Sequence, residues 1–406
     1  MSYRMARFLS TGVLSLALAG IDPMRAAAMT SCEFRPSLGN LVVGQDQVSD
    51  RPDLRRRGDD ILVDGAFCGA TVRNTDSIRV LGSDSGESLT LNLAGGPFAP
   101  GRMPEADASP EIEISVDLKG PDRPGYDSLV IEMTLDDDTL VGNADGLDLT
   151  GDGDVDVTPA GISNLLVDMR EGSDNLSLTG GEPSGKPFPF ESVDVLLNAG
   201  ADEAMLAQIS PGDEGAVFGG PGDDVIRTGS GGWRANGNAG DDVLVGGSGD
   251  DELYGGWGYD AIRGRGGDDR VWQLDAKKQR DTFVGGEGVD ELLLNLSSGY
   301  ATSVTLDERP NDGAPGELDN VSSTFERVVT GKGNDVLVGN ELAQTLSGGL
   351  GKDIITGLGG RDILRGGLGD DVFHATDGRV DRIWGGEGSD TATDRDPLDR
   401  VHHVEA

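Results

Sequence analysis

The chain has 406 residues, of which 72 are acidic and 33 basic, so its formal net charge is −39 at pH 7. This charge excludes nucleic acid and anionic membranes as expected direct partners. Aromatic residues make up only 5% of the sequence whereas glycine supplies 65 residues, which argues against one large globular core and favours many thin stacked layers.

Residues 1–28 have the pattern of a secretory signal peptide. Arg4 and Arg7 precede an apolar run that begins at Phe8 and is followed by small residues. The run is shorter than the about 20 residues that a membrane-spanning helix needs, and no later apolar segment is long enough either. We therefore expect a secreted, extracellular or cell-surface protein after removal of the signal peptide. A lipoprotein cysteine at Cys32 is the less favoured alternative.

Residues 29–70 form the next expected segment, and they contain both cysteines of the chain, Cys32 and Cys68. In a secreted protein two thiols near one end are expected to pair, so we predict a disulfide. The basic run Arg55–Arg57 lies between them. It is interpreted as a solvated loop, with a processing site or an anion contact as the alternatives.

Residues 71–210 carry a weak recurring motif in which an acidic residue precedes Ser, Thr or Asn and then an aliphatic residue. The copies begin at Asp76, Glu87, Asp127, Asp138 and Asp174. Flanking residues alternate between apolar and polar as in half-buried strands. We predict a degenerate parallel β-solenoid, and a separate β-sandwich of about seven strands remains the competing interpretation. Calcium sites are not assigned here, because the glycine-rich turn is mostly missing.

The segment DLTGDGDVD, which begins at Asp148, resembles an EF-hand loop through Asp148, Thr150, Asp152 and Gly153. The twelfth position is Pro159 instead of Glu, and no helical pattern flanks the segment. A solenoid turn and a lone calcium loop both remain open.

Residues 211–293 contain a stretch, 219–272, that aligns with itself in nonapeptides. All but the second nonapeptide have Asp at position six and an aliphatic residue at position eight: Asp224 with Ile226, Asp242 with Leu244, Asp251 with Leu253, Asp260 with Ile262, and Asp269 with Val271. The glycine-rich half requires positive φ angles, which glycine tolerates. The other half is a very short strand whose middle side chain faces inward.

Two nonapeptides make one coil with a turn at each end, and successive coils stack at about 4.8 Å. The turns then form two columns, in which Asp242 lies near both Asp224 and Asp260, and Asp251 lies near Asp269. These carboxylates would repel one another without a cation. A hard cation with about six to eight oxygen ligands resolves this, and calcium fits better than magnesium because magnesium demands stricter geometry.

The same alignment predicts where the pattern fails or continues. Trp233 replaces the Asp of the second nonapeptide, so its turn should bind calcium poorly. Residues 273–284 are interpreted as one repeat with an enlarged turn, in which Asp281 keeps its place before Phe283. Asp290 then heads the last repeat of the block.

Residues 294–329 are expected to form a β insertion of two strands around a loop. The second repeat block covers residues 330–393, and Gln344 replaces one of its Asp residues. Its other repeats pair Asp335 with Leu337, Asp353 with Ile355, Asp362 with Leu364, Asp371 with Phe373, and Asp381 with Ile383, and Asp390 precedes Ala392 where a larger core residue is expected. Residues 394–406 are interpreted as a polar tail after the end of the stack.

The nonapeptides resemble the RTX, or haemolysin-type, calcium-binding repeats of secreted bacterial proteins, which follow the pattern GGxGxDxUx. The resemblance covers residues 219–293 and 330–393. It implies an all-β fold in which a parallel β-roll (β-solenoid) in two repeat blocks binds several calcium ions. The implied metal ligands are Asp224, Asp242, Asp251, Asp260, Asp269, Asp290, Asp335, Asp353, Asp362, Asp371, Asp381 and Asp390.

A catalytic constellation is not recognisable in the sequence. The three histidines, His374, His402 and His403, lie in or after the last repeats. Neither an HExxH zinc motif nor a GxSxG motif with a later histidine can be assembled. We assign no catalytic and no cofactor-binding residues other than the calcium ligands.

These observations predict a secreted calcium-binding repeat protein without catalysis, which serves as a surface-layer, matrix or adhesion component. Its expected partners are calcium and an extracellular polysaccharide or another surface protein. The alternative is an extracellular enzyme of the polysaccharide lyase or epimerase type that carries the repeats as a folding and secretion module. A Lys or Arg cluster lining a groove in residues 71–210 would favour the enzyme.

Overall fold

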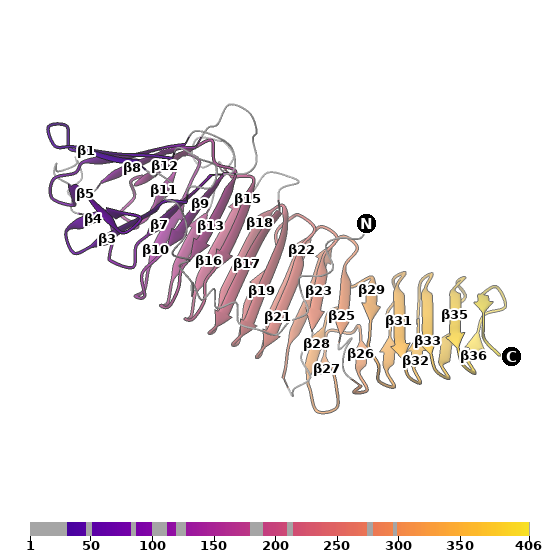
Figure 1. Cartoon of the computed structure of the whole chain (residues 1–406). Coiled ribbons are helices and arrows are strands. Elements are labelled where there is room, and N and C mark those ends of the chain that lie inside the picture. Colours follow the sequence, from indigo (N-terminus) through magenta and orange to yellow (C-terminus); the bar gives the residue numbers. More distant parts are fainter. Residues whose placement is uncertain are drawn as a thin grey trace, which may run out of the picture.

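The computed structural model describes residues 31–45, 51–82, 87–99, 112–118, 127–178, 190–208, 214–273, 279–294 and 299–405. Within these ranges the regular secondary structure consists of β-strands, most of them in parallel pairs, and no helix occurs. The described part of the chain accordingly contains no helix that could span a membrane. The strands stack into a long rod with the N-terminal strands at one end and the C-terminal strands at the other (Figure 1). The predicted all-β parallel solenoid is confirmed, whereas the predicted signal peptide lies outside the described residues.

Two faces of the rod are formed by successive strands of each coil. The first face, sheet A, has in spatial order β1 (Ser31–Arg35), β2 (Asn40–Gly44), β6 (Ser77–Leu81), β8 (Glu113–Asp117), β12 (Val157–Ala160), β11 (Leu147–Asp148), β10 (Thr139–Gly142), β14 (Asn175–Leu178), β16 (Glu203–Gln208), β18 (Val225–Ser230), β20 (Val243–Val245), β22 (Ala261–Gly266), β24 (Thr282–Glu287), β28 (Asp319–Val321) and β27 (Pro310–Asp312).

The second face, sheet B, is an open sheet that follows the whole rod. Its order is β5 (Ala66–Thr71), β4 (Asp60–Val63), β3 (Asp53–Arg57), β7 (Ser88–Asn92), β9 (Ser128–Glu132), β13 (Asn164–Asp168), β15 (Ser192–Leu196), β17 (Glu214–Pro221), β19 (Gly232–Ala239), β21 (Glu252–Trp257), β23 (Arg270–Gln273), β25 (Glu291–Leu294), β29 (Arg327–Val329), β31 (Thr345–Leu350), β33 (Ile363–Leu368), β35 (Arg382–Glu387) and β37 (Arg400–His402). The third sheet, sheet C, continues the face of sheet A with β26 (Ser303–Thr305), β30 (Val336–Val338), β32 (Ile354–Thr356), β34 (Val372–Ala375) and β36 (Thr391–Arg395).

The coils shorten toward the C-terminus. In sheet B, Ser128 lies opposite Asn164, Asn164 opposite Ser192, and Ser192 opposite Glu214, so the offsets are 36, 28 and 22 residues. From Glu214 to Gly232 the offset falls to 18 residues, the length of two nonapeptides. Because these strands are parallel and in register, the described part of residues 71–210 forms a solenoid that leads directly into the roll. The competing sandwich interpretation is therefore wrong.

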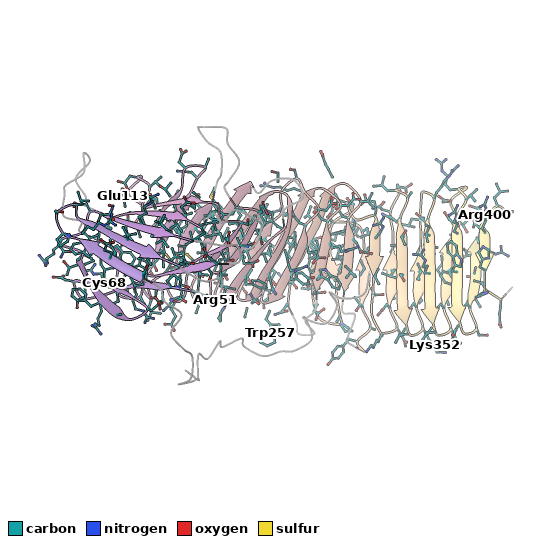
Figure 2. All side chains as sticks on the ribbon, turned by 45° about the horizontal axis from the view of Figure 1, so that its top comes forward. Arg51, Cys68, Glu113, Trp257, Lys352 and Arg400 are labelled. Carbon is teal, nitrogen blue, oxygen red and sulfur yellow. A yellow bond between two sulfur atoms is a disulfide. The ribbon has the colours of Figure 1, made fainter. Side chains whose placement is uncertain are left out.

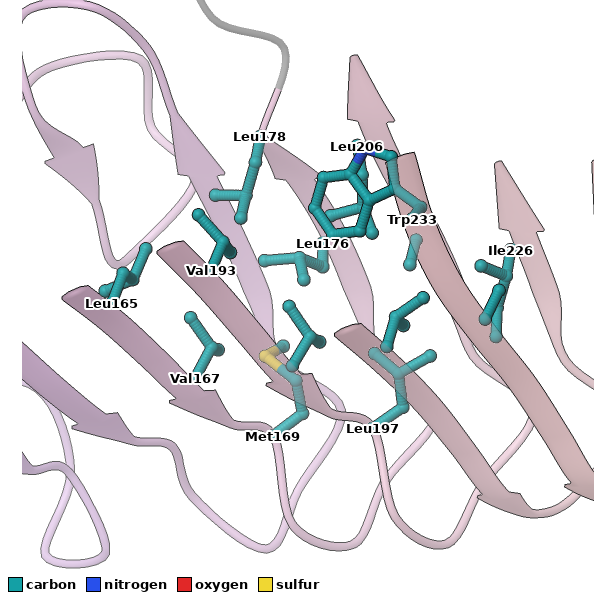
Figure 3. Packing of buried hydrophobic residues seen from close by; sticks show 14 of the residues in the cluster. Leu165, Val167, Met169, Leu176, Leu178, Val193, Leu197, Leu206, Ile226 and Trp233 are labelled. Atoms are coloured by element: carbon teal, nitrogen blue, oxygen red, sulfur yellow. The ribbon is translucent and has the colours of Figure 1, made fainter. Parts of the chain in front are cut away.

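The width of the core explains this shortening. Strands of the long coils bury two alternate side chains, such as Leu165 and Val167 in β13, and Figure 3 shows such pairs beside their neighbours. Many strands of the short coils bury one apolar side chain, such as Leu253 in β21 or Leu337 in β30, ahead of a small glycine-rich turn. The predicted core residues are confirmed and are at most 1% exposed: Ile226, Leu244, Leu253, Ile262, Val271, Phe283, Leu292, Leu337, Ile355, Leu364, Phe373 and Ile383.

Antiparallel strands close the N-terminal end. β1 pairs with β2, and β3, β4 and β5 form an antiparallel meander at the end of sheet B. The predicted disulfide is present and joins Cys32 in β1 to Cys68 in β5. Arg56 of the basic run donates hydrogen bonds to the carbonyl oxygens of Pro97 and Ala99, so it anchors a neighbouring segment. Arg55 pairs with Asp53.

Two hairpins interrupt the face of sheets A and C in the same way. β11 and β12 lie between β8 and β10, and β27 and β28 lie between β24 and β26. In each case the last hairpin strand pairs in parallel with the preceding coil. In sheet B, β9 pairs directly with β13 and β25 pairs directly with β29, so no strand is inserted at either position. Within residues 294–329, the hairpin strands β27 and β28 are thus added to one face only, whereas β29 continues sheet B.

The C-terminal segment also joins the stack. β36 pairs with β34, and Ala392 lies opposite Phe373 although it is only half-buried. β37, from the segment interpreted as a polar tail, pairs in parallel with β35. Val401 and Val404 pack against the end of the core. The last coil therefore covers the hydrophobic core with mostly polar residues.

Candidate calcium site

Buried aspartates form a continuous ladder along the turns that lead into sheet A. The backbone N–H of Asp224 donates to Oδ1 of Asp242 at 2.8 Å, and the N–H of Asp242 donates to Oδ1 of Asp260 at 3.0 Å. The ladder extends in both directions through the same bond, and its members are Asp138, Asp174, Asp202, Asp224, Asp242, Asp260, Asp281 and Asp319. It resumes ahead of sheet C as Thr302, Asp335, Asp353, Asp371 and Asp390.

A second ladder follows the opposite edge, along the turns that lead into sheet B. The N–H of Asp251 donates to Oδ1 of Asp269 at 2.8 Å, and that of Asp269 donates to Oδ1 of Asp290 at 3.0 Å. Further members are Trp233 at its start and Glu326, Gln344, Asp362, Asp381 and Asp399 beyond. The structure thus brings together every predicted pair of neighbouring turns, and it separates the two edges.

The second carboxylate oxygen of most ladder residues has no hydrogen-bond donor. Oδ2 is buried without a partner among the described residues in ten of the twelve predicted aspartates: Asp224, Asp242, Asp269, Asp290, Asp335, Asp353, Asp362, Asp371, Asp381 and Asp390. Asp174 and Asp202 share this state. A buried carboxylate oxygen without a donor or cation is costly. A cation is the simplest partner that satisfies a whole row of them.

The first glycine of the nonapeptide turn allows carboxylate and carbonyl oxygens to converge. A Cβ atom added at Gly219 would collide with Oδ2 of Asp224 and would lie 2.6 Å from the carbonyl oxygen of Gly237. The same arrangement recurs at Gly237, where Oδ2 of Asp242 and the carbonyl oxygen of Gly255 converge. Glycine is thus required for a steric reason, because carboxylate and carbonyl oxygens meet at its Cα.

Calcium suits this donor set. The described residues hold no group of three or more His, Cys, Asp or Glu side chains that could alone bind a metal ion. A site between turns would consequently depend on carboxylates of neighbouring turns together with backbone carbonyl oxygens. Calcium accepts about six to eight such oxygen ligands in flexible geometry. The residues present therefore fit calcium, and bound calcium would neutralise the buried carboxylates.

Burial changes the acidity of the ladders. Desolvation raises the pKa of Asp242 to about 8, and the carboxylates of Asp260 and Asp224 add to the effect while a backbone N–H opposes it. Desolvation likewise raises the pKa of Asp353 and Asp362 to about 7. Without a cation, Asp242, Asp353 and Asp362 would therefore be partly protonated at neutral pH.

At the two degenerate turns, protein groups bind side-chain oxygen atoms that would otherwise lack a donor. The Trp233 indole is buried and packs beside Gly215, where any Cβ would collide with the ring. In the next turn, Oδ2 of Asp251 accepts hydrogen bonds from the N–H of Gly247 and from Oγ1 of Thr228. At Gln344, Oε1 accepts the N–H of Asn340 at 2.9 Å. These contacts agree with the expected weak calcium binding beside Trp233.

The EF-hand-like segment forms the loop between β11 and β12. Oδ1 of Asp148 accepts the N–H groups of Thr150 and Gly151, and its Oδ2 accepts the N–H of Gly153. Backbone donors thus occupy both oxygens of Asp148. The segment is the loop of an antiparallel hairpin, and not a turn between two coils of the solenoid.

Several ladder residues could not be predicted from the nonapeptide pattern. The weak motif of residues 71–210 includes Asp174 without predicting it as a ligand, and no motif in the sequence marks Asp202, Asp319, Glu326 or Asp399. The signal available for Asp202 is its place before Glu203 and Ala204, with Ala204 buried opposite Ile226. The other three lie where a turn has been enlarged or its glycines lost.

The fold and the ladders define a class: a parallel β-roll with buried acidic residues at both edges, built from glycine-rich nonapeptides. Residues 216–232, 236–271, 338–373, 347–380 and 376–393 match the family model of the RTX calcium-binding nonapeptide repeat (4 copies). These two blocks are RTX calcium-binding nonapeptide repeats. No curated protein matches the chain.

Proposed function

We propose that the protein is secreted and that its roll folds on extracellular calcium, so that it serves as a non-catalytic component of a cell surface or matrix. The observation that carries the proposal is the row of buried Oδ2 atoms without donors in both ladders. The proposed ligands are the twelve aspartates predicted from the nonapeptides, together with Asp281 and turn carbonyl oxygens. Extracellular calcium modules commonly bind at about 10⁻⁴–10⁻³ M.

The hydrogen bonds between neighbouring turns of the ladders support cooperative binding of calcium. Most ladder residues donate their N–H to the carboxylate of the next turn, so ordering one turn prepares its neighbour. Folding of stacked repeats depends on such nearest-neighbour contacts. We expect calcium to fold each block in a narrow concentration range.

The test is a calcium titration of the full chain, followed by circular dichroism and by scattering radius, with magnesium as the control cation. The expected result is a calcium-specific gain of β signal and a compaction in the millimolar range. Equal effects of magnesium, or a compact fold in chelator that calcium leaves unchanged at pH 8, would overturn the proposal.

The enzyme alternative gains no support from the described part of residues 71–210. A hollow there lies beside Thr134, Asp137 and Asp138 and has acidic, hydroxyl and apolar side chains. The lining of this hollow contains no Lys or Arg, whereas a basic groove would favour catalysis.

A further inference from the structure

One outward-facing row of sheet B changes its charge pattern along the rod. In the first repeat block the row reads Arg234, Glu252, Arg270, Glu291 and Arg327, each opposite the next. Nε of Arg234 lies 3.0 Å from Oε2 of Glu252, and Nε of Arg270 lies 3.0 Å from Oε2 of Glu291. Positive and negative groups alternate here and largely cancel.

The same row ends in Ile363, Arg382 and Arg400, so it lacks acidic residues in the last three coils. Arg361 lies at the turn directly before Ile363. The three arginines are exposed, and none forms an ion pair with a described carboxylate. Strands lie about 4.8 Å apart, so the cationic groups of Arg382 and Arg400 repel one another. An anionic partner would relieve this repulsion.

A hollow of about 300 Å³ connects these side chains, and we call it the arginine hollow. It is lined by Arg361, Asp362, Ile363, Val380, Arg382 and Arg400. Asp362 is buried in its ladder, so the cations dominate the exposed lining. The corresponding hollow of the first block has exposed Asp250 and Asp268 in its lining. The sign of the charge is therefore reversed at the same position of the repeat.

The neighbouring outward row adds planar groups beside the arginine hollow. Arg365, Trp384 and His402 lie opposite one another in successive strands. The Trp384 and His402 rings stack with centroids 5.6 Å apart, and Cζ of Arg365 lies 5.6 Å from the Trp384 ring centroid. Figure 2 places Arg400 on the edge opposite Lys352, whose ammonium group is paired with Asp370. Arg361, Arg382 and Arg400 thus form a group of exposed arginines beside sheet B in the last coils.

We propose that the arginine hollow binds an acidic polysaccharide through the carboxylates of its uronate residues. Guanidinium groups bind carboxylates through two parallel hydrogen bonds. The three arginines belong to three successive coils and extend about 10 Å along the rod, which exceeds a single oxyanion. Planar side chains at the rim suit the flat faces of sugar rings. This proposal deepens the proposed matrix role and relies on it for the extracellular setting.

The remaining surface disfavours a denser polyanion. The whole chain carries a net charge of −39, so a long nucleic acid would meet repulsion on both sides of the hollow. A uronate chain carries one charge per sugar ring, which is fewer along its length than the one charge per about 1.7 Å of duplex DNA, and its hydroxyl groups can bond the polar rim. We therefore assign the surface to the carbohydrate and treat single-stranded nucleic acid as a competing outcome.

The test is calorimetric titration of the full chain in calcium with a short oligogalacturonate. A neutral malto-oligosaccharide and an oligothymidylate of the same length are the comparison ligands. We expect binding of the oligogalacturonate alone, weakened by added salt because the contacts are ionic. Binding of the oligothymidylate in its place, or equal binding of the neutral sugar, would overturn the proposal.

The matched variants are Arg382→Gln with Arg400→Gln, and Arg263→Gln on the opposite face as the control. The double change should weaken oligogalacturonate binding about tenfold or more, since two charge-assisted contacts are lost. The control should bind like the unchanged protein, and unaltered affinity in the double variant would refute the proposal. Circular dichroism of each protein during a calcium titration tests calcium-dependent folding separately from sugar binding. If the unchanged protein folds on calcium but does not bind the oligogalacturonate, the carbohydrate proposal fails and the calcium proposal stands.

Discussion

The two carboxylate oxygens of Asp242 have different roles. Its Oδ1 accepts the N–H of Asp224, whereas its Oδ2 is buried without a donor. An asparagine could keep the first contact, because an amide oxygen also accepts a hydrogen bond. It would remove the negative charge that a calcium ion requires.

We predict that Asp242→Asn raises the calcium concentration at the folding midpoint, on the order of tenfold, because one charged ligand is lost between two pairs of turns. The same change should stabilise the calcium-free roll at pH 8, because it removes a buried charge. Circular dichroism during calcium titration measures both effects. Asp152→Asn, on the exposed loop between β11 and β12, is the control and should leave the midpoint unchanged. A midpoint equal to that of the unchanged protein would exclude Asp242 as a ligand.

Gln344 permits the opposite experiment. It occupies a ladder position, and its N–H donates to Oδ1 of Asp362 at 2.8 Å. Gln344→Asp restores the nonapeptide pattern and adds a carboxylate beside Asp362, so we expect folding of the second block at lower calcium. Gln344→Asn supplies the matched control, since it shortens the side chain without adding charge. A higher calcium midpoint in the Asp variant would contradict the prediction.

The residues that could be predicted from the sequence are those in coils of constant length. An offset of 18 residues fixed both the inward residues, such as Leu244 and Ile262, and the ladder neighbours, such as Asp242 and Asp260. Asp202 was missed because the offset to Asp224 is 22 residues, and no repeating spacing precedes it. Asp202 can therefore be assigned to the ladder only from the strand pairing of the folded chain.

At the scale of the elements, the N-terminal meander is the part whose stability depends on a covalent bond. β1 pairs with β2, and β5 only with β4. The disulfide between Cys32 and Cys68 spans 36 residues and ties the two outer strands together.

Replacing both cysteines by serine should lower the free energy of unfolding of this end by about 3–4 kcal/mol in the chain-entropy model. Chemical denaturation followed by limited proteolysis of the first coils measures the loss. The calcium midpoint of the second repeat block serves as the internal control and should not change, because it lies many coils away. Unaltered protease resistance of β1 to β5 would show that hydrophobic packing alone holds this end.

The two inserted hairpins could not be predicted as such. Two strands around a loop were expected in residues 294–329, but the structure forms β27 and β28 in the segment expected to be the loop, and Thr282 pairs with Asn320 across 38 residues. Single-sequence periodicity contains no signal for so distant a pairing. The first hairpin was recognised only through the acidic loop at its tip.

For the whole molecule, proton and calcium binding are alternatives at the same carboxylates. Burial raises the pKa of Asp224, Asp260 and Asp269 from 3.8 to about 7 and that of Asp242 to about 8. A group with a raised folded pKa favours the folded state below its unfolded pKa, and this contribution disappears as the pH rises through the folded pKa.

We therefore predict that the protein in chelator keeps more β structure at pH 5 than at pH 8. Calcium should restore the signal at pH 8 and should release protons when added near pH 7, since the ladders must deprotonate to bind it. Circular dichroism at both pH values and pH-stat titration measure these effects. Identical spectra in chelator at pH 5 and pH 8, with no proton release, would contradict this coupling.

The unequal number of strands on the two faces has a mechanical consequence. Each hairpin inserts two strands, about 10 Å of sheet, into one face while sheet B opposite gains none. A rod built this way has a preferred curvature at two points along its length. When its ends are pulled apart, we expect it to straighten at these points before any coil separates, so it would yield elastically under small loads. Sheet B, which is uninterrupted from β5 to β37, would carry the tension that remains.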